Sequence, residues 1–328
     1  MIITKTPFRI TLGGGGTDLP SYYSKYGGFI FSASINKYMF ISVNQPVLDD
    51  LIRIRHDKVE TAKNIDDIQH EIAREALRVM KIKKNIEITS MSDIAAGTGL
   101  GSSSCYAVGL INSLCCLKKK RTSPKLLADK ACNLEIEILK KPVGKQDQYM
   151  AAYGGLTILN IDKQGKVRVR KANISENTLR ELNKNLLAFY TNRTRSSTII
   201  LGDQGKNIRN NRGNVVNSMH AIKEIGYKIL KAAESGNISK IGLLFDEHWQ
   251  NKKKTSGKIS NPAFNKIYNI AKDNGALGGK ISGAGGGGFF VFYVEKNHNK
   301  FVKLMEKMGL DQMKYGFNFE GSKLLINS

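Results

Sequence analysis

Alternating apolar and polar residues predict several strands in the first part of the chain. This period-two pattern is typical of a strand with one buried face, and it occurs at residues 2–12, 29–43, 52–55 and 85–90. Residues 66–80 instead carry apolar side chains three or four positions apart, which predicts an amphipathic helix. The beginning of the chain therefore combines a sheet with at least one covering helix.

Helical spacing predominates after residue 100. Helices are predicted at residues 102–117, 123–139, 173–185, 213–235, 238–252, 261–274 and 297–308. Strands are predicted for a hairpin at 154–169 and at 186–191, 289–294 and near 314–319. Because strands and helices do not alternate regularly, the pattern favours an α+β fold over a doubly wound sheet.

The length of the chain indicates two domains. At 328 residues it is too long for one ordinary core. The polar helix predicted at 173–185 is the candidate junction, so we expect an N-terminal domain at 1–175 and a C-terminal domain at 176–328.

Composition and cysteine usage predict a cytoplasmic protein. Apolar residues make up 41% and charged residues 24%, which is typical of a soluble globular protein. No stretch approaches the roughly 18 to 20 consecutive apolar residues of a membrane span, and the first residues lack the apolar run of a signal peptide. The four cysteines form no C-x-x-C pair, so we expect reduced core cysteines and no zinc site.

The formal net charge of +23 is the unusual feature of the composition. Nucleic acid, an anionic membrane surface and anionic small substrates could each explain it. The basic residues are spread along the chain without interleaved aromatic residues, and the lysine-rich runs at 118–121 and 252–254 suggest solvated helix ends. The charge is compatible with phosphorylated ligands and does not by itself establish them.

The strongest chemical signal is the segment AGTGLGSSS at residues 96–104, between a predicted strand and a predicted helix. Glycines let successive backbone N–H groups surround an anion, and a helix start adds the positive end of its dipole. The segment is neither a Walker A loop, since it lacks the lysine, nor a dinucleotide fingerprint. It predicts phosphate binding, with a tight structural turn as the alternative. The residues expected at the phosphates are Gly97, Gly99, Leu100, Gly101, Ser102, Ser103 and Ser104.

Two further glycine-rich segments are candidates for close contact with a ligand. Seven of the eleven residues at 278–288 are glycine, which favours close approach of this backbone to a ligand or to another loop. The glycines at 13–16 lead into Thr17 and Asp18, a hydroxyl and a carboxylate suited to sugar hydroxyls. A hairpin turn is the alternative explanation for residues 13–16.

Acidic residues complete the set that phosphoryl transfer requires. Asp147 lies in the segment GKQDQ at 144–148, after a predicted helix that carries Glu135 and Glu137. In such reactions one carboxylate holds magnesium on the β- and γ-phosphates while another lies beside the attacking hydroxyl. For any single one of these residues, a solvated surface charge is the alternative.

Together these segments resemble the GHMP kinases, a family named for galactokinase and for homoserine, mevalonate and phosphomevalonate kinases. The family's first motif is similar to residues 6–18, its phosphate loop to 97–104 and its third motif to 280–288. The resemblance implies an N-terminal α/β domain with a left-handed β-α-β unit and a ferredoxin-like C-terminal domain, with the active site between them. It also implies ATP as phosphate donor and Mg²⁺ as cofactor.

The resemblance assigns roles to residues that match the family motifs. Ser103 and Glu135 would complete the coordination of magnesium, and Glu135 is preferred because it lies twelve residues before Asp147, although Glu137 remains possible. Asp147 would be the catalytic acidic residue near the acceptor hydroxyl, and Arg9 would lie beside it and stabilise developing charge.

For the acceptor, the resemblance implies that Thr17 and Asp18 bind sugar hydroxyls. The third motif would support the phosphate loop and approach the substrate through Gly283, Ala284, Gly285 and Gly286. A phosphorylated sugar also needs cations for its own phosphate, and the candidates are Lys145, Arg193 and Arg195.

Within the family, the motifs GGGTDLP at 14–20 and YTNRTRSS at 190–197 resemble the heptose 7-phosphate 1-kinases and related sugar 1-kinases. Galactokinases carry Glu-His where this chain has Gly15 and Gly16, and Ala95 replaces the usual proline of the phosphate loop. The implied reaction transfers the γ-phosphoryl group of ATP to the anomeric hydroxyl and gives a 1,7-bisphosphate. Alternatives are a fucose-type sugar 1-kinase, a non-catalytic binding protein and nucleic-acid binding. The sequence leaves monomer and homodimer open.

Overall fold

A computed structural model describes residues 1–211 and 214–327. Its helices are α1 (Pro20–Tyr26), α2 (Glu71–Val79), α3 (Ser102–Leu117), α4 (Pro124–Cys132), α5 (Gln146–Tyr153), α6 (Glu176–Asn185), α7 (Ser197–Asn210), α8 (Val215–Glu234), α9 (Ile238–Lys253), α10 (Pro262–Asp273) and α11 (His298–Lys307). Its strands are β1 (Ile2–Gly13), β2 (Gly28–Asn44), β3 (Ile52–Arg55), β4 (Val59–Ala62), β5 (Ile86–Ser92), β6 (Leu156–Ile161), β7 (Val167–Lys171), β8 (Leu186–Tyr190), β9 (Ala276–Ile281), β10 (Phe289–Val294), β11 (Asp311–Met313) and β12 (Lys323–Asn327).

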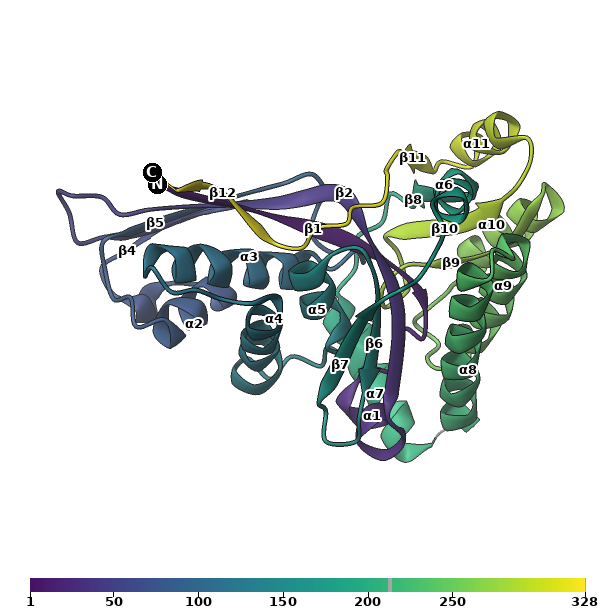
Figure 1. Cartoon of the computed structure of the whole chain (residues 1–328), viewed down its shortest axis with the longest axis horizontal. Coiled ribbons are helices and arrows are strands. Elements are labelled where there is room, and N and C mark those ends of the chain that lie inside the picture. The colour runs from purple at the N-terminus through teal and green to yellow at the C-terminus, as the bar shows by residue number, and fades with distance from the viewer. Residues whose placement is uncertain (212–213, 328) are drawn as a thin grey trace.

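The larger sheet is built around two long strands. In the order β12-β1-β2-β5-β3-β4, all pairs are antiparallel except β3 with β5, and β6 and β7 continue the sheet from the first half of β2. Helices α2 to α5 cover one face of this sheet (Figure 1). The first half of β2 is buried at every position because both α5 and α8 pack against it, whereas its second half alternates. The alternation predicted from the sequence therefore applies only where one face is covered.

The smaller sheet has the antiparallel order β11-β8-β10-β9. With its helices it forms the β-α-β-β-α-β arrangement of a ferredoxin-like domain, in which α9 packs on β9 and α8 runs beside α9 (Figure 1). A second core of large aromatic residues fills this part, with Trp249, Phe290, Phe292 and Phe301 fully or nearly fully buried. Since β10 is buried at all six positions, its apolar run is that of a central strand covered on both faces.

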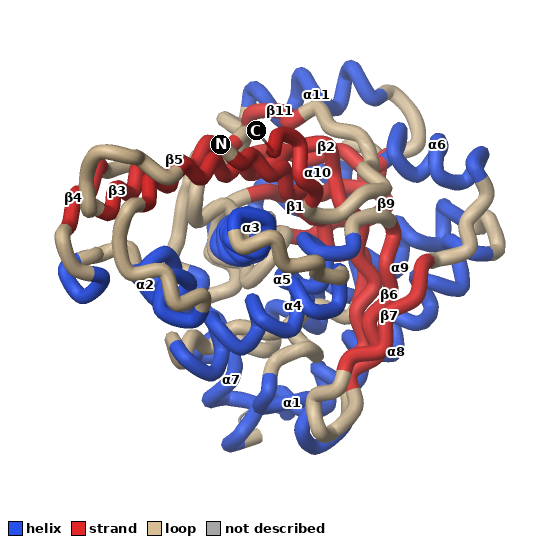
Figure 2. Tube along the Cα trace, turned by 60° about the vertical axis from the view of Figure 1, so that its left-hand side comes forward, coloured by secondary structure: helices blue, strands red, loops and turns tan. Residues whose placement is uncertain are grey.

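The chain returns to the first sheet at its end. Strand β12 pairs with β1, so the two termini lie side by side (Figure 2). The predicted domain boundary at residue 175 immediately precedes α6, which leads into the smaller sheet, and it stays a prediction. The last strand, β12, nevertheless belongs to the larger sheet. The predicted C-terminal domain at 176–328 does not anticipate this return of the chain to the N-terminal domain.

Most predicted elements are confirmed, with one wrong strand and several omissions. The strand predicted near 314–319 is only an isolated bridge between Ile35 and Phe317, and β11 and β12 lie on either side of it. The sequence patterns also missed α1, β4, α5, α7 and β9. Residue 213, the first of the helix predicted at 213–235, lies outside the described residues.

The expectation of reduced, mostly buried cysteines agrees with the structure. The cysteines are free thiols, with Cys105, Cys115 and Cys132 buried and Cys116 partly buried. Among the described helices, none combines the length and the apolar character needed to cross a membrane.

Candidate active site

A cavity of about 720 Å³ opens where the two sheets meet. Its wall includes Arg9 from β1, the phosphate loop, Asp147 at the start of α5, and Lys252 and Gly283 from the smaller domain. Residues from motifs that are far apart in the sequence therefore line the same cavity.

The phosphate loop ends in the start of α3. Gly101 lies at the N-cap position of this helix with a φ of 93°, in the left-handed region that favours glycine. A Cβ atom at Gly101 would lie 3.4 Å from the Asp147 carboxylate, so the loop backbone and the acidic residue are in direct contact. The loop thus holds its amides at a helix N-terminus next to Asp147, which is the arrangement expected for phosphate binding.

The third glycine-rich segment supports the phosphate loop from behind. A Cβ atom at Gly283 would lie 2.4 Å from the Gly99 carbonyl oxygen, and one at Gly288 would lie 1.9 Å from the Thr98 carbonyl oxygen. Any side chain at either position would displace the phosphate loop. Gly283 and Ala284 also line the cavity, whereas Gly285 and Gly286 pack closely against the backbone of Ile259 and Lys258, respectively.

Arg9 and Asp147 form a bidentate ion pair beside the phosphate loop. Arg9 Nε donates to Asp147 Oδ1 at 2.7 Å, and Nη2 donates to Oδ2 at 2.8 Å. The remaining Nη1 donates to the Gly99 carbonyl oxygen at 2.8 Å, which ties the pair to the loop. The Arg9 side chain is 3% exposed and that of Asp147 is 25% exposed, so the carboxylate is the member of the pair that a ligand can reach. Such planar, two-point pairing fixes the carboxylate orientation.

Glu135 lies on the other side of Asp147 and collects hydroxyl and amide donors. Ser104 Oγ and Gln148 Nε2 each donate to Glu135 Oε2 at 2.7 Å, and Ser103 Oγ donates to Oε1. Glu135 is 1% exposed, and it belongs to the π-helical segment Asn133–Ile138 that follows α4. Glu137 instead points to solvent and pairs with Lys140 at 3.7 Å. The geometry therefore favours Glu135 over Glu137 as a metal ligand.

Asp18 forms a third polar group at the glycine-rich turn after β1. Gln146 donates to Asp18 Oδ2 from its backbone N–H at 3.0 Å, and the backbone N–H of Gly16 donates to Oδ1 at 3.2 Å. Thr11 Oγ1 donates to Gln146 Oε1 at 2.7 Å and so orients this side chain. Thr17 has a different role from the one predicted, because its hydroxyl is fully buried and bonded to the backbone of Gly14 and Phe29.

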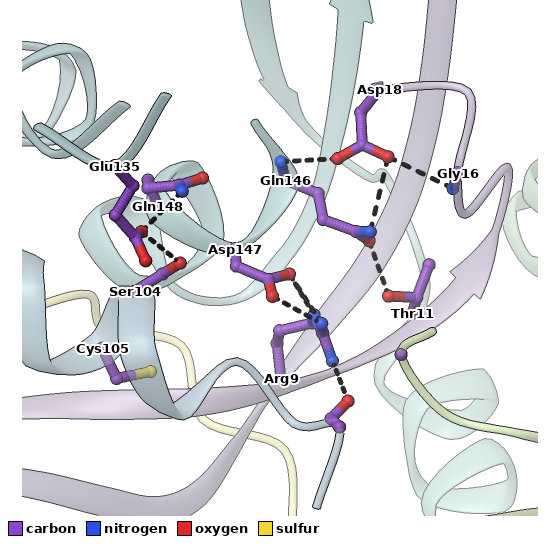
Figure 3. Close-up of polar contacts among 12 residues, drawn as sticks. Arg9, Thr11, Gly16, Asp18, Ser104, Cys105, Glu135, Gln146, Asp147 and Gln148 are labelled. Atoms are coloured by element: carbon purple, nitrogen blue, oxygen red, sulfur yellow. Dashed lines mark hydrogen bonds and ion pairs between the residues drawn. The ribbon is translucent and has the colours of Figure 1, made fainter. Parts of the chain in front are cut away.

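The first turn of α5 connects these three groups. Gln146 binds Asp18, Asp147 binds Arg9 and Gln148 binds Glu135 (Figure 3). Consecutive helical residues point in directions about 100° apart, so one short helix can serve three separate partners. A shift of α5 would therefore move all three groups together.

Two family models match the chain, and a related kinase aligns along almost all of it. The model for the GHMP kinase N-terminal domain matches residues 67–155, and that for the GHMP kinase C-terminal region matches residues 229–308. The D-glycero-alpha-D-manno-heptose 7-phosphate kinase of Campylobacter jejuni is 30% identical over 98% of both chains. The chain belongs to the GHMP kinase family. It is therefore a kinase, and the phosphate donor of this family is ATP.

Two further proteins are similar to this GHMP kinase. An L-fucokinase/L-fucose-1-P guanylyltransferase of Bacteroides fragilis is 26% identical over 92% of this chain but only 35% of its own length. The crystal structure of a D-glycero-D-manno-heptose 1-phosphate kinase from Bacteroides thetaiotaomicron covers 100% of both chains with a TM-score of 0.83 and 22% identity. The latter likeness establishes the fold.

Two of the three cations predicted for the acceptor phosphate do not reach the cavity of this GHMP kinase. Lys145 Nζ donates to the Gly165 carbonyl oxygen at 2.6 Å, and Arg193 lies over the Phe264 ring with 5.8 Å between guanidinium and ring centroid. Among the described residues that line the cavity, Arg195 is the member of the predicted set. The structure thus corrects the expected placement of Lys145 and Arg193.

Arg195 lies at the phosphate loop. Its Nε donates to the Gly285 carbonyl oxygen, and its Nη2 would lie 2.9 Å from a Cβ atom at Gly99. This buried Nη2 has no hydrogen-bond partner among the described residues. Burial and the positive charge of Arg9 lower the pKa of Arg195 to about 10, so the guanidinium is still charged at neutral pH. An unpaired buried donor beside the phosphate loop suits a nucleotide phosphate better than the distant phosphate of a sugar acceptor.

Sequence reasoning missed other members of the cavity wall. Lys252, assigned to a solvated helix end, is 6% exposed and lines the cavity. Gln146 and Tyr106 also line the cavity, whereas Gln148 is fully buried and acts through its hydrogen bond to Glu135. For Lys252 a signal existed, because it continues the apolar spacing of Ile241 and Phe245 on α9.

The titration of Asp18 tests whether this carboxylate contacts the acceptor. Burial raises the pKa of Asp18 to about 6, although the N–H of Gln146 favours the ionised form. The ionised fraction therefore increases as the pH rises through this value. If the carboxylate accepts hydrogen bonds from the acceptor, kcat/KM for the acceptor should rise about tenfold from pH 5 to pH 7.

In Asp18→Asn this pH-dependent rise should disappear, and kcat/KM for the acceptor at pH 7.5 should fall about 10- to 100-fold because a charged hydrogen-bond acceptor is lost. Steady-state kinetics of both proteins over the pH range measures the effect, with kcat/KM for ATP as the internal control. An unchanged pH profile in Asp18→Asn would remove Asp18 from the acceptor site.

Proposed function

We propose that this GHMP kinase transfers the γ-phosphoryl group of ATP to the anomeric hydroxyl of D-glycero-D-manno-heptose 7-phosphate, for the synthesis of nucleotide-activated heptose. The observation that carries the proposal is the Arg9–Asp147 pair, which faces the phosphate loop in a cavity that Asp18 also lines. The heptose assignment is supported by the relative that is 30% identical over 98% of the chain.

In the proposed reaction the acceptor hydroxyl lies beside Asp147, and its oxygen attacks the γ-phosphorus of ATP. The new oxygen–phosphorus bond forms as the bond to the β-phosphate oxygen breaks, and ADP leaves. The proton of the hydroxyl passes to the Asp147 carboxylate, which Arg9 holds in place. An anomeric hydroxyl is more acidic than an ordinary alcohol, so positioning and a late proton transfer suffice. Arg195 Nη2, which has no partner among the described residues, is a donor for the charge on the phosphoryl oxygens.

The Glu135 site fits a magnesium ion. A carboxylate and two serine hydroxyls are the hard oxygen donors that Mg²⁺ prefers. The ion pairs of the described residues do not include Glu135, so this deeply buried carboxylate has only hydroxyl and amide partners. We assign Glu135 and Ser103 as the residues that hold the ion. An ion held there would neutralise negative charge on the β- and γ-phosphates.

The nucleotide base is proposed to occupy the end of the cavity lined by aromatic rings. The ring centroids of His56 and His70 are 4.8 Å apart, and those of His70 and Tyr106 are 4.6 Å apart. The Tyr106 hydroxyl is buried without a hydrogen-bond partner among the described residues. Flat rings and an unpaired hydroxyl suit a purine, and these rings line the same cavity as the phosphate loop and Asp147.

A fucose-type sugar 1-kinase is the second candidate. It is favoured by the bifunctional fucokinase relative, which is 26% identical over 92% of this chain. Both candidates use the same transfer geometry and differ in the acceptor, so acceptor preference separates them.

The test measures ADP release with purified protein, magnesium and ATP across heptose 7-phosphate, unphosphorylated heptose, mannose 6-phosphate, fucose, galactose and mevalonate. We expect kcat/KM for heptose 7-phosphate to exceed that for fucose and galactose by about 10²-fold or more. The position of the new phosphate, determined by NMR, should be C1. Turnover on fucose alone would replace the heptose assignment by the second candidate, and turnover on unphosphorylated heptose alone would refute the phosphosugar assignment.

A further inference from the structure

Lys252 is a buried basic residue near the end of α9, and it lines the active-site cavity. It is 6% exposed and lines the cavity next to Gly283 and Ala284. Its Nζ donates to the carbonyl oxygens of Ile281 at 3.2 Å and Gly283 at 2.5 Å. An ammonium group has three N–H donors, so these two carbonyls leave one donor for a ligand.

The charges around Lys252 are unbalanced. The ion pairs of the described residues do not include it, and the charged groups that act on it, Arg195 and Arg9, are both cations. Asp147 is already paired with Arg9. A buried positive charge without a counter-charge is costly, and an anion in the cavity would compensate it.

Two other buried basic groups adjoin Lys252 but do not line the cavity. Lys280 on β9 donates to the Leu12 carbonyl oxygen and lies over the Phe245 ring, 4.4 Å from its centroid. His248 lies one turn earlier on α9 and is fully buried. Burial, together with Lys252, lowers the pKa of Lys280, and burial with Lys280 and Lys252 lowers the pKa of His248. Of these three basic groups, Lys252 is therefore the one that a ligand in the cavity can contact.

We propose that Lys252 binds the phosphoryl group that is transferred, contacting it from the side of the smaller domain. The two carbonyl groups that Lys252 contacts belong to Ile281 and Gly283, and Gly283 packs against Gly99 of the phosphate loop. The charged groups near Lys252 are Arg195 and Arg9, and Arg9 orients Asp147. This location corresponds to the point of transfer. The inference deepens the proposed function and rests on it only for the transfer of phosphate from ATP, independently of which sugar accepts it.

A measurable consequence is that nucleotide binding takes up a proton. Burial and the charges of Arg195 and Arg9 lower the pKa of Lys252 to about 7. At pH 7.5 about three quarters of the free enzyme then carries a neutral Lys252. A phosphate group in contact with Nζ favours the ammonium form and raises this pKa, so binding should take up about 0.7 proton per nucleotide at that pH.

Isothermal titration calorimetry in two buffers of different ionisation enthalpy measures this uptake. The ligands are the magnesium complexes of ADP and of the non-hydrolysable ATP analogue AMP-PNP, and heptose 7-phosphate alone. For the wild-type enzyme we expect about 0.7 proton with AMP-PNP at pH 7.5 and less than about 0.1 with ADP or with heptose 7-phosphate. Equal uptake with ADP and AMP-PNP, or uptake with heptose 7-phosphate alone, would overturn the proposal. This arm needs no variant and no turnover.

The second arm uses Lys252→Gln, whose amide can still donate to the two carbonyl oxygens but carries no charge. Its uptake with AMP-PNP should vanish and kcat should fall about 10²-fold, while KM for ATP changes less than about threefold. Lys252→Arg should restore part of kcat, and Lys254→Gln, at an exposed position on the same helix end, should behave as wild type. Wild-type proton uptake in Lys252→Gln, or a kcat within about threefold of wild type, would refute the contact. If the proposed acceptor is wrong, the acceptor panel fails while the calorimetric result still stands.

Discussion

Asp147→Asn should lower kcat by about 10²-fold or more, while the affinity for the magnesium nucleotide is not weakened. The substitution preserves the shape of the side chain but removes the proton acceptor. It also places an NH₂ group where Arg9 now donates, at 2.7 Å to Oδ1 and 2.8 Å to Oδ2. One of these two bonds is lost, so the remaining group is both less basic and less well oriented.

The charge balance strengthens this expectation. Asp147 is the carboxylate partner of Arg9, and Arg195 adds further positive charge close by. Without the carboxylate the site becomes more positive, which favours the bound nucleotide while disfavouring the proton transfer. A lowered kcat with unweakened nucleotide binding therefore separates a role in transfer from a role in binding.

The measurement is ADP release under saturating ATP, combined with calorimetric titration of AMP-PNP. Asp273→Asn, at an exposed position at the end of α10, serves as the matched control and should leave both values unchanged. Thermal unfolding of each variant checks that the loss of kcat does not come from loss of the fold. Near-normal turnover in Asp147→Asn would refute the assignment of Asp147.

The glycine-rich segments allowed much of the site to be predicted from sequence because glycine has few reasons to cluster. Backbone contacts across the domain interface require it at Gly283 and Gly288, where a Cβ atom would collide with the phosphate loop. Such a requirement is visible in the sequence as an excess of glycine. The partner of each close contact is not visible, since it is set by packing between distant segments.

The missed helices show where tertiary contacts override local preference. Helix α7 contains Gly202 and Gly205, residues that disfavour a helix in isolation. It buries Ile200 and Ile208 against the two domains, which stabilises the helix through packing. Helix α5 is only eight residues long and follows directly on a segment with proline and glycine, so its sequence suggests a loop.

The burial of Lys252 follows the helical periodicity of α9 and differs from what its lysine-rich neighbourhood predicts. A run of lysines usually marks a solvated helix end, and its neighbour Lys254 is indeed exposed. On α9, however, buried Phe245 and Trp249 precede Lys252 at helical spacing, so the lysine lies on the buried face. The surrounding carbonyl oxygens and the cavity, which make this burial tolerable, come from β9 and the third glycine-rich segment and could not be deduced from α9 alone.

Glu135→Gln should lower kcat by about 10²- to 10³-fold at a fixed low millimolar magnesium concentration. The reason is that a weakly held magnesium ion stabilises the charge of the transition state less well. The amide keeps the size of the side chain and one oxygen acceptor. It loses the negative charge that a divalent cation requires. Its NH₂ group must also replace one carboxylate oxygen, either the one that accepts from Ser104 and Gln148 or the one that accepts from Ser103. The activation constant for magnesium should therefore increase together with the fall in kcat.

Glu137→Gln is the matched control for Glu135→Gln, since the two residues share a helical segment and the same substitution. Residues two apart on a helix do not face the same side, which is why Glu135 is 1% exposed whereas Glu137 pairs with Lys140 at the surface. The control should retain wild-type kcat and an unchanged magnesium dependence, as a surface ion pair of this kind contributes little. Activity measured against magnesium concentration for both variants decides between the residues. A loss in Glu137→Gln and not in Glu135→Gln would transfer the metal-binding role to Glu137, and equal magnesium dependence in all three proteins would exclude both.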